Sequence, residues 1–149
     1  MMQNTKLYTA LALAGTIPFI AGALLALAGY ESLPLLGRVD QLVASYGLAI
    51  VCFLAGAHWG TYLFGRSVDS LNLFVTSNVI FLAAWFAYVV ASVKTAMGVQ
   101  IVAFLVLLYI DRRLAAGDVI SASYFRIRTV ATSIATISLL IVIATVPYR

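Results

Sequence analysis

Residues 42–64 read LVASYGLAIVCFLAGAHWGTYLF, a run of 23 residues without Asp, Glu, Lys or Arg. A helix rises about 1.5 Å per residue, so a run of this length spans a hydrocarbon core of about 30 Å. Backbone N–H and C=O groups in lipid must bond within their own segment, which favours a helix. The run therefore predicts a transmembrane helix.

Four further apolar runs accompany it, at residues 7–29, 71–93, 96–110 and 129–146. The first is longer than the apolar region of a signal peptide and is predicted to be a retained helix. The fourth is short for a span. We expect an all-α, polytopic membrane protein, with a single domain over residues 1–149 built as a bundle of five transmembrane helices.

The composition agrees with a lipid solvent. Of the 149 residues, 64% are hydrophobic and 9% are charged, whereas soluble domains are about 45–50% apolar and about 25% charged. The net charge of +4 lacks the basic stripe with interleaved aromatic residues that nucleic acid requires. Nucleic acid is thus excluded, and the lipid bilayer is the first expected partner.

The basic residues predict the orientation, because loops rich in Lys and Arg stay in the cytosol. One side of the five-span topology holds six of the nine: Lys6, Arg66, Arg112, Arg113, Arg126 and Arg128. The other side holds Arg38, Lys94 and Arg149. This count predicts a cytoplasmic N-terminus and an external C-terminus.

The second run carries small residues and one ionisable residue. Gly56 and Gly60 form a GxxxG step, which lets another backbone approach closely. At about 100° per residue, His58 points about 200° away from Gly56 and shares a face with Gly47. One face is therefore predicted to pack a neighbour while the opposite face presents the imidazole.

His58 is the only histidine, and ionisable groups inside spans usually face the bundle interior. It could accept a proton, contact a quinone or touch a metal; it could equally be a neutral packing residue bonded to a neighbouring helix. No second histidine stands beside it, and Cys52 is the only cysteine, so no metal site is predicted. Trp59 is expected in the interfacial aromatic belt.

Other polar or unusual residues interrupt the spans. Asn78 and Trp85 lie seven residues apart on one helix face, and Asn in lipid seeks a partner on another helix. Pro18 removes a backbone bond and should kink the first helix after Gly15. Such a kink either serves the architecture or lines a site.

The fourth run ends in Asp111-Arg112-Arg113, and Arg126 and Arg128 precede or open the fifth on the same side. With His58 in the same half, these groups could converge on an anionic headgroup or a phosphate, or could be solvated charges. Tyr124 and Arg128 are four apart, so an aromatic–basic pair is expected.

An interfacial helical turn is predicted over residues 119–128, running into the fifth span. Gly117-Asp118 is expected to interrupt the helical structure, and the Asp118 carboxylate is expected to cap the turn.

Several of these motifs occur together in one family. They are listed in chain order: Gly15-Thr16-Ile17-Pro18-Phe19; Tyr46-Gly47, Phe53-Leu54 and His58-Trp59-Gly60; Ala84-Trp85; Asp111-Arg112-Arg113; Tyr124, Ile127-Arg128 and Thr132. With them the chain resembles the bacterial relatives of mitochondrial transmembrane protein 69, a membrane family of unknown function. The resemblance implies a multi-pass protein of the bacterial inner membrane. It supplies no reaction, cofactor or catalytic residue.

Three functions remain open from the sequence. The first is a non-catalytic accessory, assembly or stabilising subunit of a larger respiratory or photosynthetic membrane complex, with other membrane subunits as partners. The second is a protein that binds or transports a small ligand, a quinone or an anionic lipid in a cavity around His58. Its candidate ligand-binding residues are His58, Trp59, Asn78, Trp85, Asp111, Arg112, Tyr124 and Arg128, and the candidate helix-packing residues are Gly15, Pro18, Gly47, Gly56 and Gly60. The third is a membrane enzyme using His58 and Asp111. The chain contains no nucleotide-loop, hydrolase or metalloprotease motif.

Overall fold

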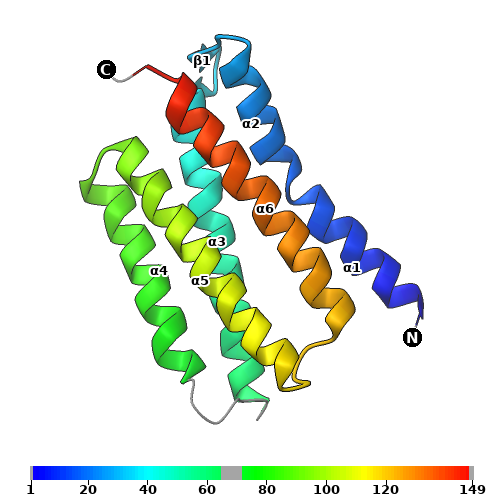
Figure 1. The fold of residues 1–149 in the computed structure, drawn as a ribbon. Helices are drawn as coiled ribbons and strands as arrows, with labels where there is room; N and C mark the ends of the chain where they lie inside the picture. The colour runs from blue at the N-terminus through cyan, green and yellow to red at the C-terminus, as the bar shows by residue number, and fades with distance from the viewer. Residues whose placement is uncertain (1, 65–71, 148–149) are drawn as a thin grey trace.

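The computed structural model of the chain describes residues 2–64 and 72–147. Figure 1 shows a bundle of long helices with one short hairpin. In chain order the elements are α1 (Met2–Ala14), α2 (Ile17–Leu27), β1 (Ser32–Leu33), β2 (Gly37–Arg38), α3 (Val39–Leu63), α4 (Leu73–Val90), α5 (Val93–Ala116) and α6 (Ala122–Thr145). The two strands are antiparallel, with Ser32 opposite Arg38 and Leu33 opposite Gly37.

Five segments are long and apolar enough to cross a membrane: Lys6–Leu27, which comprises most of α1 and α2, and each of α3, α4, α5 and α6. The predicted bundle of five transmembrane helices is confirmed. The chain crosses back and forth, so the N-terminus and the α5–α6 turn lie at one end of the bundle. The hairpin, the α4–α5 turn and the C-terminal end lie at the other (Figure 1).

The first span is broken between α1 and α2, next to the proline where the sequence predicted a kink. Pro18 stands in the first turn of α2. A backbone N–H at this position has no acceptor within the helix, so its absence in proline removes no hydrogen bond. Two carbonyls at the break find side-chain donors: Thr16 Oγ1 donates to Leu13 O at 2.7 Å, and Tyr46 OH donates to Gly15 O at 2.9 Å. The break is therefore compatible with lipid.

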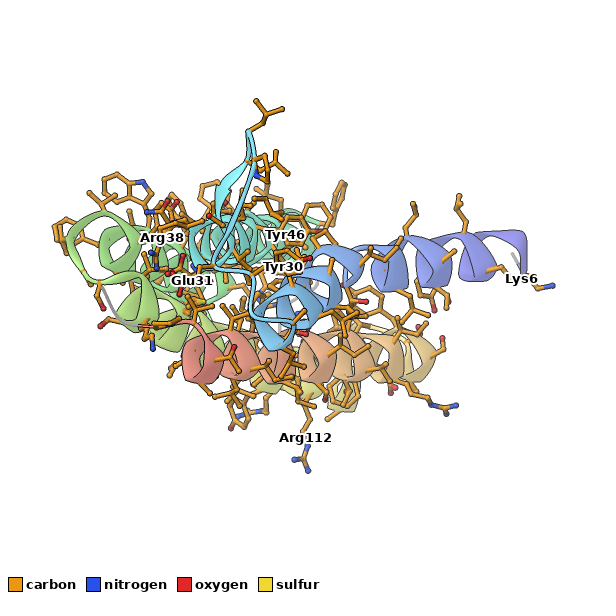
Figure 2. The ribbon with its side chains drawn as sticks, turned by 90° about the horizontal axis from the view of Figure 1, so that it is seen from above. Lys6, Tyr30, Glu31, Arg38, Tyr46 and Arg112 are labelled. Atoms are coloured by element: carbon orange, nitrogen blue, oxygen red, sulfur yellow. The ribbon has the colours of Figure 1, made fainter. Side chains whose placement is uncertain are left out.

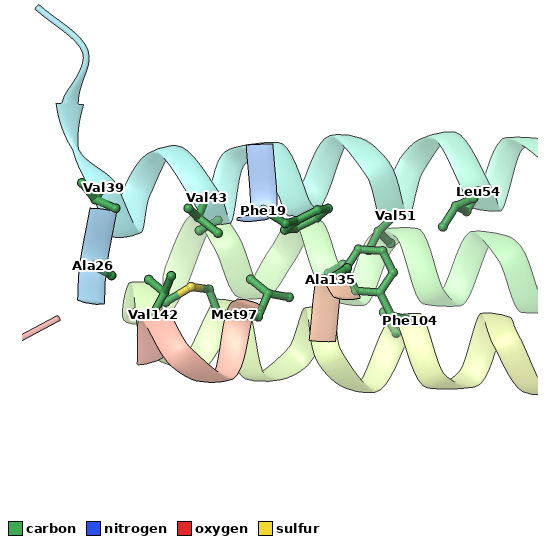
Figure 3. Close-up of a cluster of buried hydrophobic side chains, with 14 of the residues drawn as sticks. Phe19, Ala26, Val39, Val43, Val51, Leu54, Met97, Phe104, Ala135 and Val142 are labelled. Carbon is green, nitrogen blue, oxygen red and sulfur yellow. The ribbon is translucent and has the colours of Figure 1, made fainter. Parts of the chain in front are cut away.

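The apolar core lies where α2, α3, α5 and α6 meet. Figure 3 shows Phe19, Val51 and Phe104 among its side chains. Close approach depends on Gly47, because a Cβ there would collide with the side chain of Gln100 on α5. Gln100 is fully buried and donates through Nε2 to Ala44 O at 2.8 Å, which joins α5 to α3.

Two local predictions need correction. The fourth span, predicted to end at residue 110, continues to Ala116 because the charged residues at its end extend the helix. Asp118 does not cap a helix: it has a φ of 55°, and Ser121 is the N-cap, its Oγ accepting from Tyr124 N. The helical turn predicted over residues 119–128 begins at Ala122 and, as predicted, runs into the fifth span as the start of α6.

The third span begins later than predicted. Asn72, which the sequence placed inside it, is the N-cap of α4 and accepts from the backbone of Phe74 and Val75. Two of the basic residues counted for the orientation, Arg66 and Arg149, lie outside the described residues.

Candidate functional site

Three ionisable side chains from three helices meet inside the bundle. His58 of α3 and Arg128 of α6 both bond to Asp111 of α5. His58 Nε2 lies 2.8 Å from Asp111 Oδ1, and Arg128 Nε donates to Asp111 Oδ2 at 2.9 Å. The exposed fraction is 4% for His58, 3% for Asp111 and 8% for Arg128. We call this group the buried network.

The contacts of the buried network pair Asp111 with both of its neighbours. Both Asp111 oxygens accept a bond, so the carboxylate is the ionised form paired with the Arg128 guanidinium. His58 Nε2 faces a carboxylate oxygen and carries its proton. His58 Nδ1 is buried without a partner among the described residues. Within the network the Asp111 carboxylate balances the charge of the Arg128 guanidinium.

A cavity of about 460 Å³ lies beside the buried network, between the two halves of the first span, α3 and α6. Sixteen residues line it: Tyr8, Leu11, Ala12, Gly15, Thr16, Phe19, Ile50, Phe53, Leu54, Ala57, Phe104, Tyr124, Arg128, Ala131, Thr132 and Ala135. Within the part of the chain that the structure describes, Arg128 is the one charged residue of this lining. It is shared by the cavity and the network.

Polar groups on one face of α6 reach this cavity. Tyr124, Arg128 and Thr132 follow one another at intervals of four, so they stack along one helix face. Arg128 Nη2 and Thr132 Oγ1 are buried and have no partner among the described residues. Such orphaned polar atoms are uncommon in native proteins and point to a partner outside the described residues.

The first helix closes the end of the cavity near Tyr124. The ring centroids of Tyr8 and Tyr124 are 6.0 Å apart, and Tyr8 OH lies 3.2 Å from Ser123 Oγ. These contacts join α1 to the start of α6. Tyr124 and Arg128, which the sequence predicts to pair, both line the cavity, together with Tyr8.

A second, polar hollow of about 340 Å³ lies at the other end of the bundle, near the α4–α5 turn. Its lining includes Arg38, Asp40 and Lys94. Arg38 donates to Asp40 through Nε at 3.0 Å and through Nη2 at 2.8 Å. This hydrogen-bonded carboxylate raises the pKa of Arg38 above its usual value. The pair satisfies itself, so we do not assign a ligand there.

Several residues expected at the site lie elsewhere. Trp59 is 39% exposed and packs on Phe74, with ring centroids 4.2 Å apart. Asn78 does not reach another helix in the described structure; its Nδ2 donates to Phe74 O of its own helix at 2.7 Å. Trp85 is exposed and contacts Phe86.

The predicted arginine cluster is only partly formed. Arg128 turns into the bundle, whereas Arg112 is exposed and points away from it, as Figure 2 shows. The difference follows from helix geometry, because Asp111 and Arg112 lie about 100° apart around α5. If Asp111 faces the core, Arg112 must face outward.

The glycines of α3 differ in their surroundings among the described residues. Gly47 is closely packed, and a Cβ at Gly15 would lie 4.0 Å from the Tyr46 hydroxyl. A Cβ at Gly56 or Gly60 would meet nothing within 4 Å among the described residues. Since Gly56 lies opposite the buried His58, it faces outward.

Comparison with models of known protein families identifies the family of the chain. The model of a family described as "Protein of unknown function (DUF3429)" matches residues 4–144. The chain belongs to the DUF3429 family. No curated protein and no solved structure matched it. The DUF3429 match covers the whole buried network and the whole cavity lining.

Sequence reasoning missed three features of this DUF3429 protein: the bond from Gln100 to the α3 backbone, the bond from Tyr46 to Gly15, and the place of Tyr8 in the cavity wall. Gln100 carried a usable signal, because a lone amide within an apolar run usually bonds to another helix. Tyr8 carried none, since an aromatic residue near the end of a span is ordinary.

Proposed function

We propose that this protein binds an apolar small molecule within the bilayer, in the cavity between its first span, α3 and α6. The polar end of the molecule lies at Arg128 and Thr132. One observation carries the proposal: both residues line an otherwise largely apolar cavity, and both keep a buried polar atom that no described residue pairs with. Quinones and lipids are membrane molecules of this general kind.

The dimensions and chemistry of the cavity support the proposal. Small-molecule sites have volumes of about 300–1,000 Å³, apolar walls and a few placed polar groups. The cavity of about 460 Å³ falls in this range. A buried donor without a partner costs about 1–3 kcal/mol, so a ligand acceptor that bonds to Arg128 or Thr132 recovers part of that cost.

The test is to extract the full chain from its membranes in polymer-bounded lipid discs and to identify retained small molecules by mass spectrometry. Ala131 lines the cavity, so Ala131→Phe should fill it and remove the molecule. Ala83→Phe on the exposed face of α4 is the matched control and should retain it. A molecule retained equally by both variants, or absent from the parent protein, contradicts the proposal.

A second candidate is a subunit of a larger membrane complex, respiratory or photosynthetic. The observation that favours it is the open space around Gly56 and Gly60, a GxxxG step without a neighbour in the described chain. Crosslinking in native membranes tests it. Gly56→Leu with Gly60→Leu should abolish a crosslink to another subunit, while Ala83→Leu should not; crosslinks that survive the glycine changes contradict this role for the step.

An enzyme using His58 and Asp111 has less support. The two are within hydrogen-bond reach at 2.8 Å, as proton transfer requires. However, Asp111 uses both of its oxygens inside the network, and His58 is absent from the cavity lining among the described residues. Nothing there would bring a substrate to the imidazole, so we assign His58 to the support of Arg128.

The membrane setting is also a proposal. Three exposed basic residues stand near helix ends: Lys6 in the first half of α1, Arg112 near the end of α5 and Arg126 near the start of α6. The N-terminus and the α5–α6 turn lie at the same end of the bundle (Figure 1). By the distribution of basic residues this end is cytoplasmic, with the protein in a bacterial inner membrane. The motifs around Pro18, His58 and Asp111 support a closer relation to mitochondrial transmembrane protein 69 within the family.

A further inference from the structure

We infer that the polar end of the ligand is a neutral carbonyl group and not an anion. The inference rests on the proposed binding in the cavity and adds the chemical class of the molecule. It comes from the pairing of Arg128 with Asp111 and from the kind of polar group that the α6 face presents to the cavity.

The charges favour a neutral group. Arg128 is paired with Asp111 through Nε at 2.9 Å, so its positive charge is already balanced. Among the described lining residues there is no second cation. An anion entering the cavity would leave a net negative charge in an apolar environment, and an unbalanced buried charge is strongly unfavourable.

The hydrogen-bonding groups favour an acceptor. The Arg128 guanidinium carries five N–H donors and no acceptor, and only its Nε bond is made within the described structure. The Thr132 hydroxyl can donate as well, and the two residues lie one helical turn apart on α6. A carbonyl oxygen has two lone pairs, so it can accept from both residues at once. A plain hydrocarbon would leave both donors unsatisfied.

The two candidate chemistries can be compared with probes that share one tail. Decyl methyl ketone carries a neutral carbonyl, and decyl sulfonate carries a permanent negative charge. Binding of each to the purified full chain in detergent is measured by mass spectrometry of the intact protein. We expect the ketone to bind and the sulfonate to bind at least about tenfold more weakly.

Thr132→Val tests the position of the carbonyl, because it keeps the shape of the side chain and removes the hydroxyl. Loss of one hydrogen bond should weaken ketone binding about 2- to 12-fold. Thr145→Val is the matched control: Thr145 is on the same helix, outside the cavity, with its hydroxyl bonded to Ile141 O. It should leave binding unchanged.

Each contrary outcome has a distinct meaning. Sulfonate bound as tightly as the ketone would overturn the neutral class while leaving cavity binding intact. Ketone binding that is equal in the parent and in Thr132→Val would overturn the placement of the carbonyl. Failure of both probes to bind would overturn this inference and the proposed function together.

Discussion

Arg128 and Asp111 are joined by a 2.9 Å hydrogen bond between Nε and Oδ2 inside the bundle. Both residues stand near the ends of α5 and α6 that meet at the α5–α6 turn. The short turn between α5 and α6 lets the two residues face each other. Arg128, which the sequence analysis counted among the basic residues that set the orientation, is therefore buried inside the bundle. The pair holds Arg128 at the wall of the cavity, where its remaining donors can meet a ligand.

Removal of the carboxylate should destabilise the protein strongly. Asp111→Asn leaves Arg128 buried without its counter-ion, and breaking a buried pair costs about 3–5 kcal/mol. The melting temperature in detergent should fall accordingly, whereas Asp118→Asn in the exposed turn should leave it unchanged. The combined change Asp111→Leu and Arg128→Met should recover much of the loss. A single Asp111→Asn variant as stable as the parent would contradict the pairing.

Loss of the imidazole should have a smaller effect. His58→Phe keeps an aromatic ring but leaves Asp111 Oδ1 without its partner. A hydrogen bond to a charged group contributes about 1.5–3 kcal/mol, so the free energy of unfolding should fall by about that amount. Trp59→Phe, next in sequence and exposed, is the control. Equal stability of parent and His58→Phe would show that the bond does not form.

Two glycines of α3 should respond oppositely to alanine. Gly47→Ala places a Cβ against Gln100 and should cost about 1–3 kcal/mol through overpacking. Gly56→Ala meets open space and should be neutral or stabilising by up to about 1 kcal/mol, because alanine favours the helix. Thermal unfolding of both variants in detergent checks the contrast, and a reversed order would show that the rotation of α3 is wrong.

The broken first span should depend on Tyr46. Tyr46→Phe removes the donor to Gly15 O, which exposes a backbone carbonyl at the break. We expect a loss of about 0.5–1.5 kcal/mol and faster hydrogen exchange at residues near the break, such as Phe19 and Ile20. Tyr88→Phe on α4 serves as the control. Unchanged exchange at the break would contradict a role for the hydroxyl.

The orientation can be measured by labelling. After Cys52→Ser, a single cysteine is placed at Ser121 in the α5–α6 turn or at Ser32 in the hairpin, which lie at opposite ends of the bundle. In intact bacterial cells a membrane-impermeant maleimide should label position 32 and spare position 121. The inverse pattern would contradict the cytoplasmic N-terminus.

The sequence was sufficient for features that depend on local rules. Runs such as residues 42–64 have one stable form in lipid, so the five spans followed from length and polarity. Pro18 marked the break in the first span, because proline cannot donate a backbone bond. His58 was correctly expected to face the interior, since an ionisable group is costly against lipid.

Features that depend on how helices pack together were beyond the sequence. Whether Asp111 or Arg112 faces inward is set by the rotation of α5 against α3. The sequence does not indicate this rotation, because both residues are charged and adjacent. The end of α5 depends on whether charged residues continue a helix into water. The cavity lies between the first span, α3 and α6, and no motif encodes how these helices pack together.

The most direct test of the account is an experimental structure of the full chain in its native lipids. We expect density in the cavity beside α6, with an oxygen atom of the bound molecule within hydrogen-bond distance of Arg128 or Thr132. A cavity closed by side chains, with the Arg128 guanidinium and the Thr132 hydroxyl bonded to the protein itself, would contradict the account.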